Sequence, residues 1–258
     1  MIDEIRKMYR CLIMFLVIVL CGAMIVEVQA EAVKMKEIPY KATDLKEDLK
    51  FLKETQSVGG FSNAKVALIP QRGESLGYLK EEGIKFDYLG NSAEVIITKD
   101  IFVYDVLILE TYKPRPYPQE VKDILKEFVA SGHGLLLISG VPHQNLLGSR
   151  DLTGFTYIND SGPVHVAVRC YITQDVPENM TLLKDAPLHG PCAAGCKAKT
   201  AMPILVFDHD PSKFTVSTNV YESGRVGFFG GGDEPVFNKI FLRMLIWCAN
   251  PDISDKVF

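Results

Sequence analysis

Six side chains that could bind a small molecule come soon after apolar segments typical of buried strands. They are Glu110, Tyr112, His143, Gln144, Asp233 and Glu234, and Gln71 and Arg72 follow an earlier apolar segment in the same way. Ligands of open parallel sheets bind beyond the carboxyl ends of the strands, so these side chains are predicted to meet in one crevice. An aromatic ring among hydrogen-bonding groups suits a sugar or another polar small molecule, although a hydrated surface rim has the same composition.

Four cysteines remain after the first 30 residues, and they could form disulfides or bind a metal. They are Cys170, Cys192, Cys196 and Cys248. In an oxidising compartment thiols tend to pair, and four cysteines allow three connectivities, of which Cys192 with Cys196 is the local one. A zinc site would combine His189, Cys192 and Cys196 with His209 or Cys170, but that spacing matches no common zinc pattern. The sequence therefore favours disulfides, and it predicts no metal site and no cofactor.

A further candidate is the polar segment Asp208-His209-Asp210, which follows an apolar run at residues 203–207. Histidine titrates near neutral pH and carboxylates bind hard cations, so this segment could supply a base or metal ligands. The favoured interpretation is a turn between two strands, because Asp and the following Pro211 are common in turns.

The N-terminal residues have the pattern of a signal peptide. Arg6, Lys7 and Arg10 precede an uncharged apolar run at residues 11–26, and the small residues Val28 and Ala30 follow it. This order predicts cleavage after residue 30. The alternative is an uncleaved N-terminal membrane anchor, because a tilted or thinned bilayer accepts a short span. Both interpretations place the folded part outside the cytoplasm, secreted, periplasmic or at the cell surface.

Composition and charge exclude several classes of protein. Among the 258 residues, 47% are hydrophobic and 23% are charged, which excludes a disordered or low-complexity chain. The formal net charge is −4, and Lys and Arg do not cluster. Because neutralising nucleic-acid phosphates needs clustered cations, no nucleic-acid partner is expected.

The remaining pattern predicts an α/β domain with a doubly wound, mostly parallel sheet and helices on both faces. Strands at 66–69, 86–89, 104–109 and 135–138 alternate with helices at 74–82 and 119–130, as in βαβ units. Strand-like segments at 164–173, 203–207, 214–219 and 225–229 predict antiparallel additions in the C-terminal half, before a final helix at 236–248. The segment Tyr221-Glu222-Ser223-Gly224 is expected to form a hairpin turn between two of these strands, with the glycine supplying the positive φ that a tight turn needs. The predicted organisation is a signal peptide at 1–30, a polar helical arm at 31–62, the α/β domain at 63–250 and a tail at 251–258.

Three features together carry a resemblance to a known superfamily. They are the strand at 135–138, the turn at Gly140 and the segment Gly-Arg-Val-Gly-Phe-Phe-Gly at 224–230 before a helix. Their order resembles class I glutamine amidotransferase-like proteins, and more narrowly the exported relatives of trehalose-utilisation type and the β-galactosidase trimerisation domain. The resemblance implies a nucleophilic Cys on a strand-to-helix turn and a His-x-Glu pair after a late strand. Here Pro142 and Gly230 stand at those positions, so the resemblance implies a member that lacks the catalytic groups.

The sequence thus predicts an exported, non-catalytic domain that binds a polar ligand, carbohydrate being one option, or a partner protein such as an envelope protein. One alternative is a hydrolase acting on carbohydrate or an amide through Asp208, His209, Asp233 or Glu234, with or without a metal. Another alternative is a structural subunit of a cell-envelope complex. Oligomers are compatible with each of these functions, and contact with a membrane is expected through the N-terminal segment alone.

Overall fold

The computed structural model describes much of the chain, and every structural statement below concerns those residues. They are 35–53, 64–70, 74–110, 117–138, 150–153, 155–159, 163–177, 194–198, 200–230 and 235–253. All of them belong to the compact unit Met35–Phe258. Within these ranges, no helix has the length and apolar character needed to cross a membrane. The predicted signal peptide lies outside the described residues, so cleavage and export stay predictions.

Ten of the described strands form one mixed sheet with a parallel half, as the sequence predicts. The parallel strands are β2 (Val66–Ile69), β3 (Asp87–Tyr88), β4 (Val106–Glu110), β5 (Gly134–Ile138) and β12 (Gly224–Phe229), in the spatial order β3-β2-β4-β5-β12. Every residue of β2, β4 and β5 is buried, because helices cover both faces of the sheet. Burial on both faces explains why these segments are continuous apolar runs.

The C-terminal half adds antiparallel strands, which confirms the prediction. Strand β11 (Asp210–Tyr221) pairs with β12, β10 (Met202–Phe207) pairs with β11, and β7 (Val164–Val166) pairs with β10. Strand β9 (Ala194–Ala198) also pairs with β11, and β6 (Phe155–Asn159), which follows the short helix α6 (Arg150–Thr153), pairs with β9. The fold is therefore a mixed α/β fold with a mostly parallel core.

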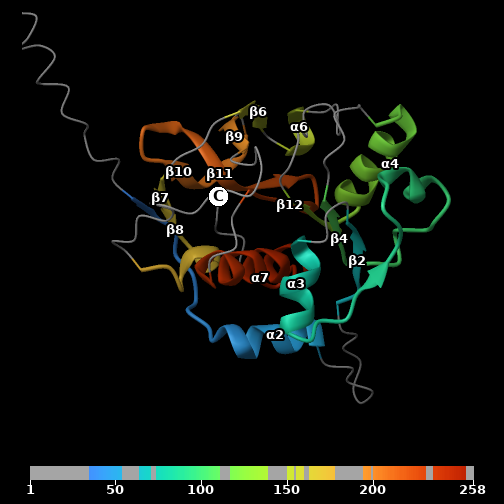
Figure 1. Ribbon diagram of the computed structural model, residues 1–258, viewed down its shortest axis with the longest axis horizontal. Helices are drawn as coiled ribbons and strands as arrows, with labels where there is room; N and C mark the ends of the chain where they lie inside the picture. Colours follow the sequence, from blue (N-terminus) through green and yellow to red (C-terminus); the bar gives the residue numbers. More distant parts are fainter. Residues whose placement is uncertain are drawn as a thin grey trace, which may run out of the picture. The chain divides into compact units, whose positions relative to one another are not determined.

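Helices pack on both faces of the parallel half. Helix α4 (Gln119–Ala130) and the 3₁₀ helix η1 (Ala93–Ile97) share one apolar cluster, whereas α7 (Pro235–Ala249), α3 (Glu74–Glu81) and α2 (Leu45–Lys53) share the other (Figure 1). Alternate side chains of β4 supply both clusters, since successive residues of a strand point to opposite faces. Val106 and Ile108 face the α7 side, and Leu107 and Leu109 face the α4 side.

The hairpin between β11 and β12 corrects one detail of the sequence-based expectation. Tyr221-Glu222-Ser223-Gly224 forms a tight turn as predicted, with Tyr221 paired to Gly224. The positive φ of 51° belongs to Glu222, whereas a glycine was expected to supply it. Gly224 is needed for another reason: a Cβ at this position would lie 2.0 Å from the carbonyl oxygen of Val129 in α4. Close helix packing, not backbone conformation, selects this glycine.

The predicted strand at 164–173 is interrupted. Strand β7 ends at Val166, strand β8 (Val168–Arg169) pairs in parallel with β1 (Lys36–Glu37), and the 3₁₀ helix η2 (Tyr171–Thr173) follows. The interruption arises because the two halves of the segment pair with different partners, β7 with β10 and β8 with β1. Residues 36–37, which lie in the predicted polar arm, thereby become part of a second small sheet.

Candidate functional site

Glu110 lies where the topology of the sheet predicts a site. Strand β2 pairs with β3 on one side and β4 on the other, so the strand order reverses between β2 and β4. The carboxyl ends of strands at such a reversal flank the usual ligand crevice. Glu110 is the last residue of β4, opposite Ile138 in β5, and 1% of its surface is exposed. The structure therefore places a buried carboxylate at the predicted edge.

The other residues predicted for this crevice lie outside the described residues. They are Tyr112, His143, Gln144, Asp233 and Glu234, together with Gln71, Arg72 and Pro142. Their convergence beside Glu110 stays a prediction.

The segment Asp208-His209 forms the turn between β10 and β11 that the sequence analysis favours. Asp208 Oδ1 lies 2.6 Å from His165 Nδ1 of β7, and the ring of His209 packs against Phe207 at a centroid distance of 5.5 Å. Within the described ranges, no group of three or more His, Cys, Asp or Glu side chains is placed to hold a metal ion.

The disulfide prediction is wrong for Cys170 and Cys248, which are buried free thiols. Cys170 is followed by η2, and its backbone N–H is bound by Thr173 Oγ1 at 3.0 Å, whereas Cys248 on α7 directs its Sγ to the carbonyl of Leu135 at 3.9 Å. Burial raises the pKa of both thiols, that of Cys248 to about 12. Each sulfur is thus enclosed in the core by its own neighbours. Cys192 and the side chain of Cys196 lie outside the described residues, so their pairing stays a prediction.

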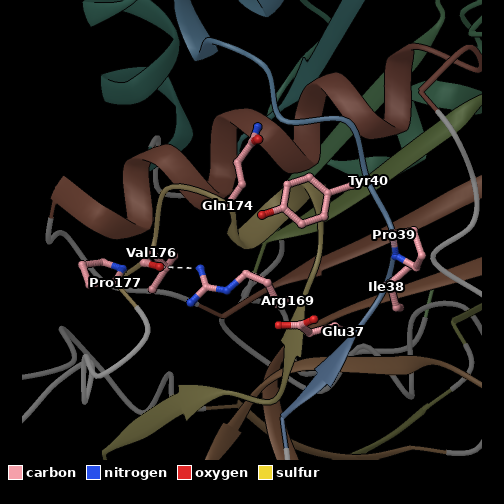
Figure 2. A pocket seen from close by; sticks show the side chains of 8 residues that line it. All are labelled: Glu37, Ile38, Pro39, Tyr40, Arg169, Gln174, Val176 and Pro177. Carbon is pink, nitrogen blue, oxygen red and sulfur yellow. Dashed lines mark hydrogen bonds between the residues drawn. The ribbon is translucent and has the colours of Figure 1, made fainter.

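A pocket that the sequence analysis missed lies between residues 37–40 and residues 169–177 (Figure 2). Its volume is about 630 Å³. Its walls are Glu37, Ile38, Pro39 and Tyr40 on one side and Arg169, Gln174, Val176 and Pro177 on the other. We call this cavity the β1–η2 pocket.

Arg169 is one of the two charged residues that line the β1–η2 pocket. Only 8% of its surface is exposed. Its Nη1 donates to the carbonyl oxygens of Thr173, at 2.6 Å, and Val176, and the second bond is drawn in Figure 2. Its Nε and Nη2 are buried and have no hydrogen-bond acceptor within the described part of the chain. A buried cation with unsatisfied donors is costly, so this edge of the guanidinium favours an added acceptor.

Glu37 and Tyr40 line the pocket beside Arg169. Glu37 is exposed, and it is the register partner of Arg169 across the β1–β8 pair. Figure 2 shows the hydroxyl of Tyr40 pointing to the middle of the pocket, while the amide of Gln174 is turned away from it. Gln174 instead accepts from the backbone N–H of Thr43 at 3.1 Å and donates to its Oγ1 at 3.3 Å. Gln174 therefore joins the two walls.

Arg243 of α7 fixes the segments that form these walls. It is fully buried, and it donates to Asp175 at 2.5 Å, to Asp48 at 3.0 Å and to the carbonyl of Thr43 at 3.0 Å. The hydroxyl of Tyr171 donates to Asp48 at 2.9 Å. Burial alone would lower the pKa of Arg243, but the hydrogen bond and charge of Asp175 raise it above its ordinary value. The arginine stays charged and holds both walls on α7.

The sequence contained only one signal for the pocket. Arg169 is a charged residue within a segment predicted to be an apolar strand, and burial of such a residue requires a polar partner. The acceptors that Arg169 has, the carbonyl oxygens of Thr173 and Val176, are local. The other wall of the pocket comes from residues 37–40, about 130 residues earlier in the chain, and no local pattern connects the two segments.

No protein-family model and no curated protein matches the chain. Among solved structures, the chain is similar to the mmIFT52 N-terminal domain, with a TM-score of 0.50 and 14% identity over 74% of this chain and 99% of that domain. It is also similar to Gan42B, a GH42 β-galactosidase from G. stearothermophilus, with a TM-score of 0.48 and 20% identity over 71% of this chain. A β-galactosidase from the haloarchaeon Halorubrum lacusprofundi gives a TM-score of 0.45 and 16% identity over 76% of this chain. The chain spans 30% and 32% of these two enzymes, and the similarities concern the fold.

Proposed function

We propose that this chain is an exported ligand-binding domain without a catalytic centre, and that it holds a polar small molecule in the β1–η2 pocket. The observation that carries the proposal is the buried guanidinium of Arg169, whose Nε and Nη2 have no acceptor within the described residues. The residue lines a cavity of about 630 Å³, and an acceptor group of a ligand would remove the cost of these buried, unsatisfied donors.

The surroundings of Gly230 support the absence of amidotransferase chemistry. The resemblance places a catalytic base at this position, where the chain has glycine. A Cβ on Gly230 would lie 2.6 Å from Oγ1 of Thr215 and 2.9 Å from its carbonyl oxygen. The backbone N–H of Gly230 also donates to the Thr215 carbonyl at 2.8 Å. A histidine does not fit here without moving β11, so loss of the base agrees with the local packing.

Extracytoplasmic localisation is part of the proposal, and the signal-peptide pattern at residues 1–30 supports it. Expression of the full chain, followed by fractionation and N-terminal sequencing of the product, tests this part. An exported protein that begins at Glu31 or retains an apolar anchor supports the proposal, and a full-length cytoplasmic product contradicts it.

Binding is tested by calorimetry with a panel of neutral sugars, simple carboxylates, inorganic phosphate and amino acids. At least one compound should bind the wild-type chain and lose tenfold or more in affinity in Arg169→Gln. The matched control is Lys99→Gln, an exposed cation that follows η1 on the α4 side of the sheet. Release of ammonia from glutamine, or of sugar from chromogenic glycosides, would contradict the absence of catalysis. Failure of the whole panel to bind would contradict the proposed function.

A further inference from the structure

The β1–η2 pocket presents two opposite charges that do not neutralise each other. Glu37 and Arg169 are register partners on adjacent parallel strands, which lie about 4.8 Å apart. Both side chains line the pocket. In the described part of the chain no ion pair joins them, and Nη1 of Arg169 donates instead to the carbonyls of Thr173 and Val176. The pocket therefore presents an anionic and a cationic group that lie next to each other.

The free edge of Arg169 matches a carboxylate. Nε and Nη2 are two parallel donors in the plane of the guanidinium, and a carboxylate accepts both in a side-on, bidentate pair. A hydroxyl or a water satisfies only one of them. Both atoms are buried, so the carboxylate must displace part of the wall to reach them. Strand β1 is the part of the wall that a ligand could displace, because it pairs with β8 through two residue pairs, Lys36 with Val168 and Glu37 with Arg169.

Glu37 determines what else the ligand can carry. A second negative charge on the ligand would be repelled by its carboxylate, which disfavours phosphate and dicarboxylates. An ammonium group would instead form an ion pair with Glu37. The side chains of Ile38, Pro39 and Val176 supply apolar surface in the same pocket, which suits a short carbon chain.

We infer that the β1–η2 pocket takes a zwitterion of the amino-acid class, with its carboxylate on Arg169 and its ammonium group on Glu37. This inference rests on the proposed function and specifies its ligand. The formal charges of Glu37 and Arg169 sum to zero, so a net-neutral ligand with separated charges matches both walls without an unpaired charge.

The test compares matched probes on the purified full chain by calorimetry. The probes are glycine, β-alanine, 4-aminobutyrate and 6-aminohexanoate, with acetate, propionate, butyrate and hexanoate as acids lacking the amine, and the corresponding alkylamines. One amino acid, at the length that spans the pocket, should bind at least tenfold more tightly than its matched acid and amine. Glu37→Gln should remove the preference over the acid, and Arg169→Gln should remove binding of both. Glu47→Gln, an exposed carboxylate on α2, should change neither.

Arg169→Lys keeps the charge but removes the pair of parallel donors. It serves as a second variant in case Arg169→Gln does not fold. Its melting temperature should stay near that of the wild type while amino-acid affinity falls at least tenfold. An acid or phosphate that binds as tightly as every amino acid overturns the zwitterion and leaves the proposed function intact. A neutral sugar that binds through Arg169 while no amino acid binds has the same consequence. Binding of no probe and no member of the wider panel overturns both.

Discussion

Replacing Arg243 with methionine tests whether the walls of the pocket depend on a buried charge. The substitution keeps an unbranched apolar side chain in α7 but removes donors to Asp175, Asp48 and the carbonyl of Thr43. Hydrogen bonds to charged groups contribute about 1.5–3 kcal/mol each, and breaking a buried ion pair costs about 3–5 kcal/mol. The side chains of Asp48 and Asp175 are 18% and 30% exposed and can regain water, which places the expected loss near the lower limit. We expect Arg243→Met to lower the free energy of unfolding by about 3 kcal/mol.

Urea denaturation followed by fluorescence or circular dichroism measures this loss. In a domain of this size, 1 kcal/mol corresponds to about 2–4 °C in melting temperature, so Arg243→Met should melt roughly 6–12 °C lower. Lys239→Met, at an exposed position of the same helix, should stay within about 0.5 kcal/mol of the wild type. Adding Asp48→Asn to Arg243→Met should cost less than the sum of the single changes, because it removes a carboxylate left without its partner. If Arg243→Met unfolds with the same free energy as Lys239→Met, the reasoning is refuted.

Two further predictions concern packing and pH. Gly224→Ala should lower the free energy of unfolding by about 1–3 kcal/mol, because its Cβ would meet the carbonyl of Val129 at 2.0 Å. The matched change Gly77→Ala in α3, where nothing lies within 4 Å, should raise it by about 0.5–1 kcal/mol, and a reversed order in urea denaturation contradicts the packing. Burial raises the pKa of Cys248 from 9.0 to about 12, so the folded chain holds the proton more firmly than the unfolded chain. The free energy of unfolding should therefore fall as the pH rises above 9.0, and Cys248→Ala should reduce this slope.

The sheet could be predicted because its strands are buried on both faces. The runs that became β4 and β5 contain almost only large apolar residues, and the helix between them shows a clear apolar face. Local pattern and tertiary environment agree in this half of the chain, so the predicted parallel sheet of βαβ units was correct. The prediction of a continuous strand at 164–173 was wrong because the second part of this segment pairs with β1. Strand β1 lies about 130 residues earlier and consists of two exposed residues, so no local pattern indicates the pairing.

The candidate site was predicted less well, for a different physical reason. Ligands of a parallel sheet usually bind at the carboxyl ends of its strands, and Glu110 lies there as expected. The β1–η2 pocket lies instead between residues 37–40 and the residues that flank η2, and Gln174 and Arg243 join the segments that form its walls. Those contacts bridge residues that are between 131 and 200 positions apart in the chain. Hydrophobic periodicity carries no information about such pairs.

The two buried arginines of this region, Arg169 and Arg243, differ in how their charge is balanced. Arg243 is fully buried and is balanced by Asp48 and Asp175, as the cost of burying a charge requires. Arg169 is 8% exposed, yet within the described residues it has two carbonyl acceptors on one nitrogen and none on the other two. Carboxylates therefore balance the charge of Arg243, whereas two donor atoms of Arg169 have no acceptor in the described part of the chain. If the partner of Arg169 were only Glu37, Glu37→Gln should destabilise the fold as strongly as Arg243→Met. If the partner is a ligand, Glu37→Gln should leave stability nearly unchanged and alter binding alone.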